Sequence, residues 1–231
     1  MVLDSNSPEE KLRHFLKLLL NSPHNLTSIK KTEQAYIKHV EDIVKPFEGK
    51  TLTGLFIDVG TGGGMPGLVM AIKFPETRWV LIDSVKKKIS EVERFVRELK
   101  LGNVNTLRGR AEELPDKYRE YFDGAFSRAI SKTDITLELC APFVKNGGDC
   151  YIYKGPSWKK EKDRVIKACA ILGFSEPDVI DYRLTDDSMR SLLICRKLRK
   201  TPKIFPRRVG KAFKKPIGVY SEKIQGDCFE R

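Results

Sequence analysis

Long hydrophobic runs, paired cysteines and clustered histidines are absent from this chain of 231 residues. No apolar stretch approaches the roughly 20 residues that a membrane-spanning helix needs, and the polar, acidic start is unlike a secretory signal. The five cysteines are odd in number, widely spaced and form no C-x-x-C pair, and the three histidines are far from them in sequence. We therefore expect no disulfide framework, no metal site, no membrane partner, and a location in the reducing cytoplasm.

Acidic residues are missing from the segment between Ser188 and Ser221, which holds eleven lysines and arginines. Those eleven account for all but one of the twelve net positive charges of the chain. A nearly neutral body with one basic segment favours a polyanionic partner such as RNA, the alternative being a solvated chain end. Phe205, Phe213 and Tyr220 alternate with the cations and could stack on unpaired bases. The cations predicted to contact RNA are Arg199, Lys200, Lys203, Arg207, Arg208, Lys211, Lys214 and Lys215.

Glycine, by contrast, is concentrated in the segment Leu55–Gly67. There a short apolar run ends in Asp58, and an apolar run bounded by glycine is typical of a buried parallel strand. Glycines permit a tight turn whose bare backbone a ligand can approach. Pro66 fits the first turn of a following helix, where its missing N–H has no cost. Strand, turn and helix together predict a cradle for a nucleotide-like cofactor. Four glycines lie within five positions of the turn: Gly60, Gly62, Gly63 and Gly64.

Strand-like and helix-like segments alternate after the glycine turn, which predicts an α/β fold with a doubly wound, mostly parallel sheet. An amphipathic pattern before the turn predicts a helical extension, with helices over 8–20 and 33–45. We therefore expect three parts: the helical extension of residues 1–50, a Rossmann-like domain of residues 51–198, and the basic tail of residues 199–231. The strands expected after the turn cover 79–83, 104–107, 122–130, 148–154, 179–184 and 191–198, and the helices cover 86–100, 133–144 and 157–172.

Asp83 ends the second predicted strand, 23 positions after the first glycine of the turn. That spacing is close to the roughly 20 residues at which an acid meets ribose hydroxyls in dinucleotide-binding folds. We interpret Asp83 as the ribose ligand, the alternative being an acid that caps the next helix. Gly62, Gly64 and Gly67 match the dinucleotide fingerprint, but Pro66 hinders a helix N-terminus that must bind pyrophosphate through free N–H groups. S-adenosylmethionine, which has no phosphate, is therefore favoured, and NAD stays open.

Several segments come in an order and at spacings that resemble one bacterial family. They are Asp58-Val-Gly-Thr-Gly-Gly-Gly-Met-Pro-Gly67, Ile82-Asp-Ser84, Gly109-Arg-Ala-Glu112, Ser127-Arg-Ala-Ile130, Tyr153-Lys-Gly155 and Arg199-Lys-Thr-Pro-Lys203. The family is that of the small-subunit rRNA guanine-N7 methyltransferases, also called glucose-inhibited division protein B. The resemblance extends from about residue 25 to residue 218. Its Ser-Arg-Ala and Arg-Lys-Thr-Pro elements are more specific than the glycine turn.

The resemblance implies a class I S-adenosylmethionine-dependent methyltransferase that modifies N7 of a guanine in the decoding-centre loop of 16S rRNA. The partner would be 16S rRNA or the small ribosomal subunit, and we expect a monomer. The residues that the resemblance assigns to the cofactor are Gly60, Met65, Asp83, Ser84, Val85, Ala111, Glu112 and Arg128. The predicted cofactor site is completed by Asp58, Gly62 and Gly64 of the glycine turn.

Methylation of guanine N7 also agrees with the motifs that the chain lacks. There is no Asn/Asp-Pro-Pro-aromatic motif, and Cys140 and Cys150 fall in a predicted helix and strand, not in a loop that could present a nucleophile. N7 carries a lone pair, so alignment with the methyl carbon and exclusion of water can suffice. We predict that Arg128 and Lys154, at strand ends, are catalytic; a structural ion pair and an ordinary exposed lysine are the alternatives. An NAD-dependent oxidoreductase and a non-catalytic RNA-binding protein on this fold also stay open.

Overall fold

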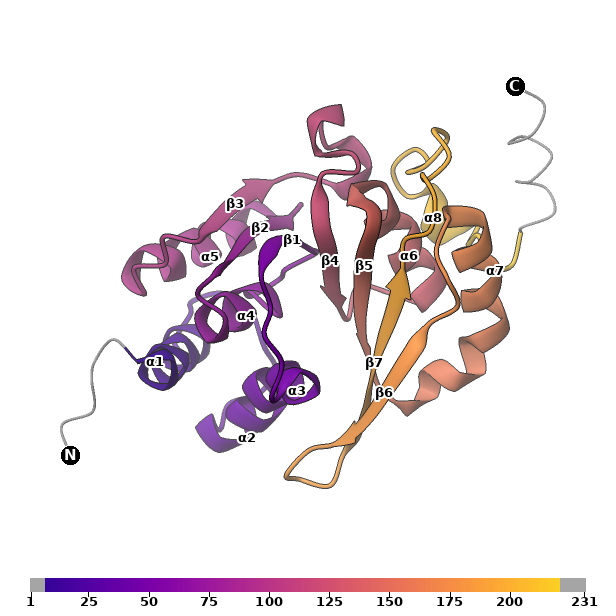
Figure 1. Cartoon of the computed structure of the whole chain (residues 1–231). Helices are drawn as coiled ribbons and strands as arrows, with labels where there is room; N and C mark the ends of the chain where they lie inside the picture. The colour runs from indigo at the N-terminus through magenta and orange to yellow at the C-terminus, as the bar shows by residue number, and fades with distance from the viewer. Residues whose placement is uncertain (1–6, 221–231) are drawn as a thin grey trace. The chain divides into compact units, whose positions relative to one another are not determined.

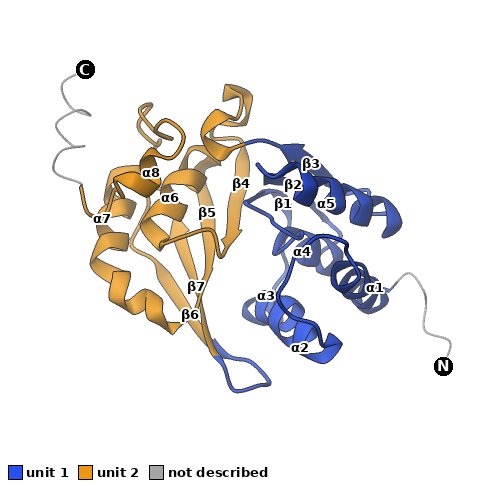
Figure 2. Cartoon of the chain, turned by 180° about the vertical axis from the view of Figure 1, so that it is seen from behind, with its two compact units in different colours: residues 1–109, 182–188 blue, residues 110–181, 189–231 orange. Residues whose placement is uncertain are grey.

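The computed structural model describes residues 7–220 and divides the chain into two compact units (Figure 2). The first unit comprises residues 1–109 and 182–188, and the second comprises residues 110–181 and 189–231. Cys228 and the outer ends of the predicted extension and tail, residues 1–6 and 221–231, lie outside the described residues. The two units differ from the three parts expected from the sequence, which stay a prediction.

The first unit opens with helix α1, Pro8–Leu20, as the sequence predicts. The Ser7 hydroxyl accepts a hydrogen bond from the Glu10 N–H (3.3 Å), and two acids in the first turn complement the helix dipole. The apolar residues repeat at helical spacing and are buried. Among them, Phe15 meets Phe95 of helix α5 (Lys86–Glu98) edge to face, with ring centroids 5.9 Å apart. This contact attaches the helical extension to the rest of the unit.

The second helix of the extension is less regular than predicted. It consists of α2 (Thr32–Tyr36), a π-helical turn (Ile37–Glu41), α3 (Asp42–Val44) and a 3₁₀ turn (Lys45–Phe47). Pro46 lies within the last turn, where the helical run ends before the first strand. The apolar spacing indicated the helix correctly, but nothing in it indicated the π-helical turn.

Three parallel strands form the sheet of the first unit in the order β3-β2-β1. Helix α5 packs against β2 and β3, and α4 packs against β2 and α1 (Figure 1). Asp83 on β2 is in register with Arg108 on β3, so both lie at the carboxyl edge of this sheet, where parallel sheets bind ligands. The elements are β1 (Gly54–Val59), α4 (Gly67–Lys73), β2 (Thr77–Asp83), α5 (Lys86–Glu98) and β3 (Val104–Arg108).

The second unit carries strands in the order β4-β5-β7-β6, with β4 parallel and β7 antiparallel to β5. Phe126 and Tyr151 stack in its core with centroids 4.3 Å apart. Helix α6 packs against β4, β5 and α7. The elements are β4 (Phe122–Arg128), α6 (Thr133–Cys140), β5 (Val144–Lys154), a 3₁₀ run (Pro156–Glu161), α7 (Lys162–Leu172), β6 (Asp178–Arg183), β7 (Met189–Arg196) and α8 (Lys211–Lys214).

The alternation of strands and helices, with mostly parallel pairing, confirms the predicted α/β fold class. Every strand expected from the sequence is present, and boundaries differ by a few residues at most except for β5, which starts four residues earlier. Within residues 7–220, no helix is both long and apolar enough to cross a membrane. The four described cysteines are buried free thiols.

Candidate active site

Asp58 braces the glycine turn after β1 from a fully buried position. Its Oδ2 accepts hydrogen bonds from the Thr61 hydroxyl (2.6 Å) and the Gly67 N–H (2.9 Å). The Thr61 carbonyl in turn accepts from the N–H groups of Gly64 and Met65, both at 2.9 Å. Asp58 was predicted to bind the cofactor, and in the structure its carboxylate stabilises the glycine turn from the buried side. Sequence reasoning passed over Thr61, although a hydroxyl residue set between glycines was a usable signal.

The glycines of the turn divide into two groups. At Gly63, Gly64 and Gly67 an added methyl carbon would lie 2.4–2.9 Å from a neighbouring side chain, so tight packing requires glycine there. Gly62 differs, because a methyl carbon there would meet no atom closer than 4.0 Å. Gly60 and Gly62 both adopt positive φ, +70° and +59°, and neither is fully buried. The turn thus exposes bare backbone at Gly60 and Gly62, where a ligand can approach it.

Asp83 ties the end of β2 to this exposed part of the turn. Its Oδ2 accepts from the Gly62 N–H (3.0 Å), and its Oδ1 accepts from the Val85 N–H (2.9 Å) just before α5. Asp83 therefore fixes the backbone just before α5, but its side chain does not cap the helix. A carboxylate offers about four acceptor positions, so two remain for the hydroxyls of a ribose. Ser84 is exposed and Val85 is 44% exposed, which leaves an apolar side chain beside the acid.

The first two amides of α4 are not available to a pyrophosphate. Pro66 carries no N–H, the Gly67 N–H is bound to Asp58, and the Leu68 N–H donates to the Gly64 carbonyl at 2.8 Å. Dinucleotide folds hold the pyrophosphate through these first helical N–H groups. The local geometry therefore fits a cofactor that brings a ribose and no phosphate, and it argues against NAD.

In the second unit, the predicted adenine-edge residues lie in a 3₁₀ turn, Ala111–Glu113. Ala111 is buried, and Oε1 of Glu112 accepts a hydrogen bond from the Gly210 N–H at 3.2 Å. Arg128 is the last residue of β4 and is partly exposed. The structure thus connects Glu112 to the basic tail, a contact that no sequence pattern indicated.

Lys154 at the end of β5 is held in a small polar network. Its Nζ donates to the Ser131 carbonyl (2.7 Å) and lies 3.9 Å from Oε2 of Glu161. The same oxygen accepts from the N–H and the hydroxyl of Thr133, both at 2.9 Å. Burial lowers the pKa of Lys154, against the opposing pull of nearby carboxylates. The interpretation as an ordinary exposed lysine is therefore wrong, because its side chain, only 16% exposed, fixes the loop that follows Arg128.

The cysteines of the second unit are unsuited to nucleophilic catalysis. Cys140 and Cys150 are completely buried. A hydrogen bond with Cys140, together with burial, raises the pKa of the Cys150 thiol well above its ordinary value. The thiolate is the nucleophilic form, so the raised pKa disfavours attack by Cys150. Burial keeps the sulfur atoms of both residues away from a substrate.

The described part of the basic tail, residues 199–220, includes the short helix α8, which lies against α6 (Figure 1). Seven of the eight tail cations predicted to contact RNA are exposed. Phe213 and Tyr220 are also exposed, at 48% and 42%. The exposed cations are Arg199, Lys200, Lys203, Arg208, Lys211, Lys214 and Lys215.

Arg207 and Phe205 differ from the expectation, because the structure buries both. Arg207 is 8% exposed and forms a two-pronged ion pair with Glu138, including an Nε–Oε1 hydrogen bond of 2.7 Å. Its guanidinium also donates to the Lys215 carbonyl (2.8 Å). Phe205 is completely buried. Neither residue presents its charge or ring to a partner; both hold the tail in place.

Two further cations anchor the tail. Arg119 donates to the carbonyls of Thr201 (2.8 Å) and Phe205 (2.7 Å). Lys197 is almost completely buried and donates to the Leu172 carbonyl (3.3 Å) and the Thr201 hydroxyl. Burial lowers the pKa of Lys197 to about 8. Sequence reasoning counted Lys197 only as part of the basic charge and missed Arg119. The Leu172 carbonyl lies 25 positions from Lys197, and Thr201 lies 82 positions from Arg119.

Comparisons with known proteins agree with this fold. Residues 8–188 match the family model GidB, described as rRNA small subunit methyltransferase G. Proteins named ribosomal RNA small subunit methyltransferase G from Pseudothermotoga lettingae and Thermotoga neapolitana are similar to this chain. The first is 44% identical over 92% of this chain and 93% of the relative, and the second is 40% identical over 90% and 91%.

Among solved structures, a 16S rRNA (adenine(1408)-N(1))-methyltransferase from Catenulisporales acidiphilia matches with a TM-score of 0.54 at 16% identity. It covers 64% of this chain and 89% of that one. At this identity the match supports the class I methyltransferase fold alone. The family model and the relatives extend the agreement to sequence, and the chain therefore belongs to the GidB family of rRNA small subunit methyltransferase G proteins.

Proposed function

We propose that this protein transfers the methyl group of S-adenosylmethionine to N7 of a guanine in small-subunit ribosomal RNA. The observation that carries the proposal is the turn after β1. It exposes Gly62 beside the acid Asp83, while the first two amides of α4 are bound within the protein. That combination favours a cofactor with a ribose and no pyrophosphate. Family membership supplies the class of substrate.

Asp83 would accept the ribose hydroxyls of the cofactor, and the backbone at Gly60 and Gly62 would contact its amino-acid end. The resemblance of the motifs gives Ala111 and Glu112 the adenine edge and Arg128 a place beside the reacting groups. Bound S-adenosylmethionine supplies an electrophilic methyl group on a sulfonium. In this proposal Lys154 fixes the loop after Arg128 through Ser131, so that loop and arginine hold one orientation.

Guanine N7 suits the side chains that are present. Attack by the N7 lone pair forms a nitrogen–carbon bond as the carbon–sulfur bond breaks, and no proton has to leave the base first. The protein then has to align the base and exclude water. The inert thiols of Cys140 and Cys150 agree with this chemistry, because methylation of a pyrimidine carbon needs a thiolate.

The RNA would be bound in part by the tail. Its exposed cations can neutralise phosphates, and the exposed rings of Phe213 and Tyr220 can stack on unpaired bases. A non-catalytic RNA-binding protein would share this surface but would not need the open Gly62.

We further propose that the protein acts as a monomer in the cytoplasm. Light scattering tests the oligomeric state, and cell fractionation tests the location.

The test is to map 7-methylguanine in 16S rRNA from cells with and without the gene. We expect one modified guanine, in the decoding-centre loop, to disappear on deletion. The wild-type gene restores it, and an Asp83→Ala variant expressed at the same level does not. Unchanged modification in the deletion strain would exclude the proposed function, and restoration by Asp83→Ala would exclude the proposed cofactor site.

A further inference from the structure

Helix α5 begins with three consecutive lysines, Lys86, Lys87 and Lys88, directly after the segment that carries Asp83. The positive end of the helix dipole lies there, so cations are unfavourable and acids favourable. The first turn of α5 nevertheless contains no acid, and no side chain caps it. In the same unit α1 begins in the opposite way, with a Ser7 cap and two acids in its first turn. The start of α5 therefore works against the stability of its own helix.

These lysines are also unneutralised. Lys86 and Lys87 are exposed and Lys88 is partly exposed. Arg108, exposed at the end of β3 and in register with Asp83, adds a fourth cation at the same sheet edge. Among residues 7–220, no carboxylate forms an ion pair with any of the four. These cations neither stabilise the helix nor form ion pairs within the described residues. A polyanion that binds to this surface would explain why they are there.

We propose that Lys86, Lys87, Lys88 and Arg108 form a second RNA-contacting surface, the α5 patch, which binds phosphates of the substrate rRNA next to the cofactor site of the first unit. The proposal rests on the proposed function, since it names a further contact for the same substrate. Lysines neutralise phosphates as mobile point charges and need no fixed partner geometry. The exposed Val85 beside them offers an apolar contact for a sugar or base.

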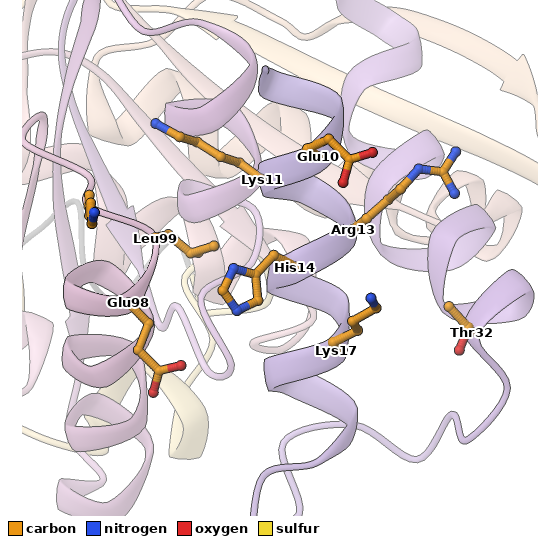
Figure 3. A pocket seen from close by; sticks show the side chains of 9 residues that line it. Glu10, Lys11, Arg13, His14, Lys17, Thr32, Glu98 and Leu99 are labelled. Atoms are coloured by element: carbon orange, nitrogen blue, oxygen red, sulfur yellow. The ribbon is translucent and has the colours of Figure 1, made fainter. Parts of the chain in front are cut away.

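The other end of α5 supplies a matched control. A surface pocket of about 780 Å³ lies there between α5 and α1, roughly 20 Å along the helix from the α5 patch. Figure 3 shows Lys11, His14 and Lys17 of α1 around it, together with Glu98 of α5 and the next residue, Leu99. Lys100 completes this side of the lining. Lys17 lies in the last turn of α1 and Lys100 directly after α5, where cations complement the helix dipole. The positions of Lys17 and Lys100 are explained by folding alone.

The experiment compares two triple variants with equal loss of charge. One is Lys86→Gln, Lys87→Gln, Lys88→Gln, and the control is Lys11→Gln, Lys17→Gln, Lys100→Gln. Glutamine has nearly the helix propensity of lysine, so charge is the main change. Binding of 16S rRNA and of small subunits is measured over a range of salt concentrations, together with thermal unfolding and S-adenosylmethionine binding.

We expect the α5-patch variant to unfold at the same or a higher temperature and to bind S-adenosylmethionine as the wild type does. Its affinity for RNA falls about tenfold or more at low salt. The slope of the logarithm of the binding constant against the logarithm of the salt concentration decreases in magnitude by roughly 2 to 3, as expected for three lost phosphate contacts. The control variant keeps the wild-type slope. Loss of stability in the α5-patch variant, or an unchanged slope in it, would overturn the inference. Failure of the wild-type protein to bind rRNA would instead overturn the proposed function.

Discussion

Arg207 and Arg208 are adjacent in the tail, but the structure gives them opposite roles. Arg207 is buried and paired with Glu138, which is itself only 1% exposed, whereas Arg208 is exposed. Replacing Arg207 by alanine leaves the Glu138 carboxylate buried without its cation. Breaking a buried pair in this way costs about 3–5 kcal/mol. Replacing Arg208 by alanine should change stability by no more than about 0.5 kcal/mol.

The assay is thermal and denaturant unfolding of both single variants, with RNA binding measured on the same preparations. For a chain of this size, about 3–5 kcal/mol corresponds to a fall in Tm of roughly 6–20 °C for Arg207→Ala. Arg208→Ala should keep the wild-type Tm and lower the salt slope of RNA binding by roughly 0.7–0.9, the contribution of one phosphate contact. Equal Tm values for the two variants would refute the distinction between anchoring and RNA-contacting cations.

Three further predictions follow from the geometry. Gly62→Ala should lower the free energy of unfolding by only about 1–2 kcal/mol, because of its positive φ, yet weaken S-adenosylmethionine binding. Gly64→Ala should lower it more, because the added methyl carbon would lie 2.4 Å from Leu68. Calorimetry that found cofactor binding intact in Gly62→Ala would contradict this prediction. The pKa of Lys197 is about 8 in the folded chain and about 10.4 in the unfolded chain, so between these values the unfolded state binds more protons. The free energy of unfolding should therefore rise between pH 8 and 10, by up to about 3 kcal/mol. Parallel unfolding profiles of the wild type and Lys197→Met over that range would refute it. Arg128→Ala should keep the fold and lose methyl transfer by about 100-fold, and wild-type turnover would remove Arg128 from the site.

Local patterns predicted the fold because each element could be read from neighbouring residues. The Ser7 cap, the spacing of the apolar residues in α1, and the apolar runs of β1 and β2 each specify an element without reference to distant segments. Pro66 correctly indicated a helix start unsuited to phosphate. The π-helical turn over Ile37–Glu41 has no comparable local signature.

The tail shows why the site was only partly predictable. Its lack of acids indicated a partner for its charge, but the sequence could not separate cations that face outward from Arg207, whose partner Glu138 is 69 positions away. The same holds for Lys154, which donates to the Ser131 carbonyl 23 positions away. The separate tasks of Gly62 and Gly64 also depend on what surrounds each residue in space.

The central claim is tested most directly by methyl transfer in a purified system. Small subunits from a strain that lacks the gene are incubated with the protein and S-adenosylmethionine carrying an isotopically labelled methyl group, and the labelled nucleoside is identified by mass spectrometry. We predict one label per subunit, as 7-methylguanosine, and none with the Asp83→Ala variant. Two results would contradict the account. One is a labelled methyl group on a pyrimidine carbon or an exocyclic amine. The other is the absence of label on naked rRNA, on assembly intermediates and on finished subunits alike.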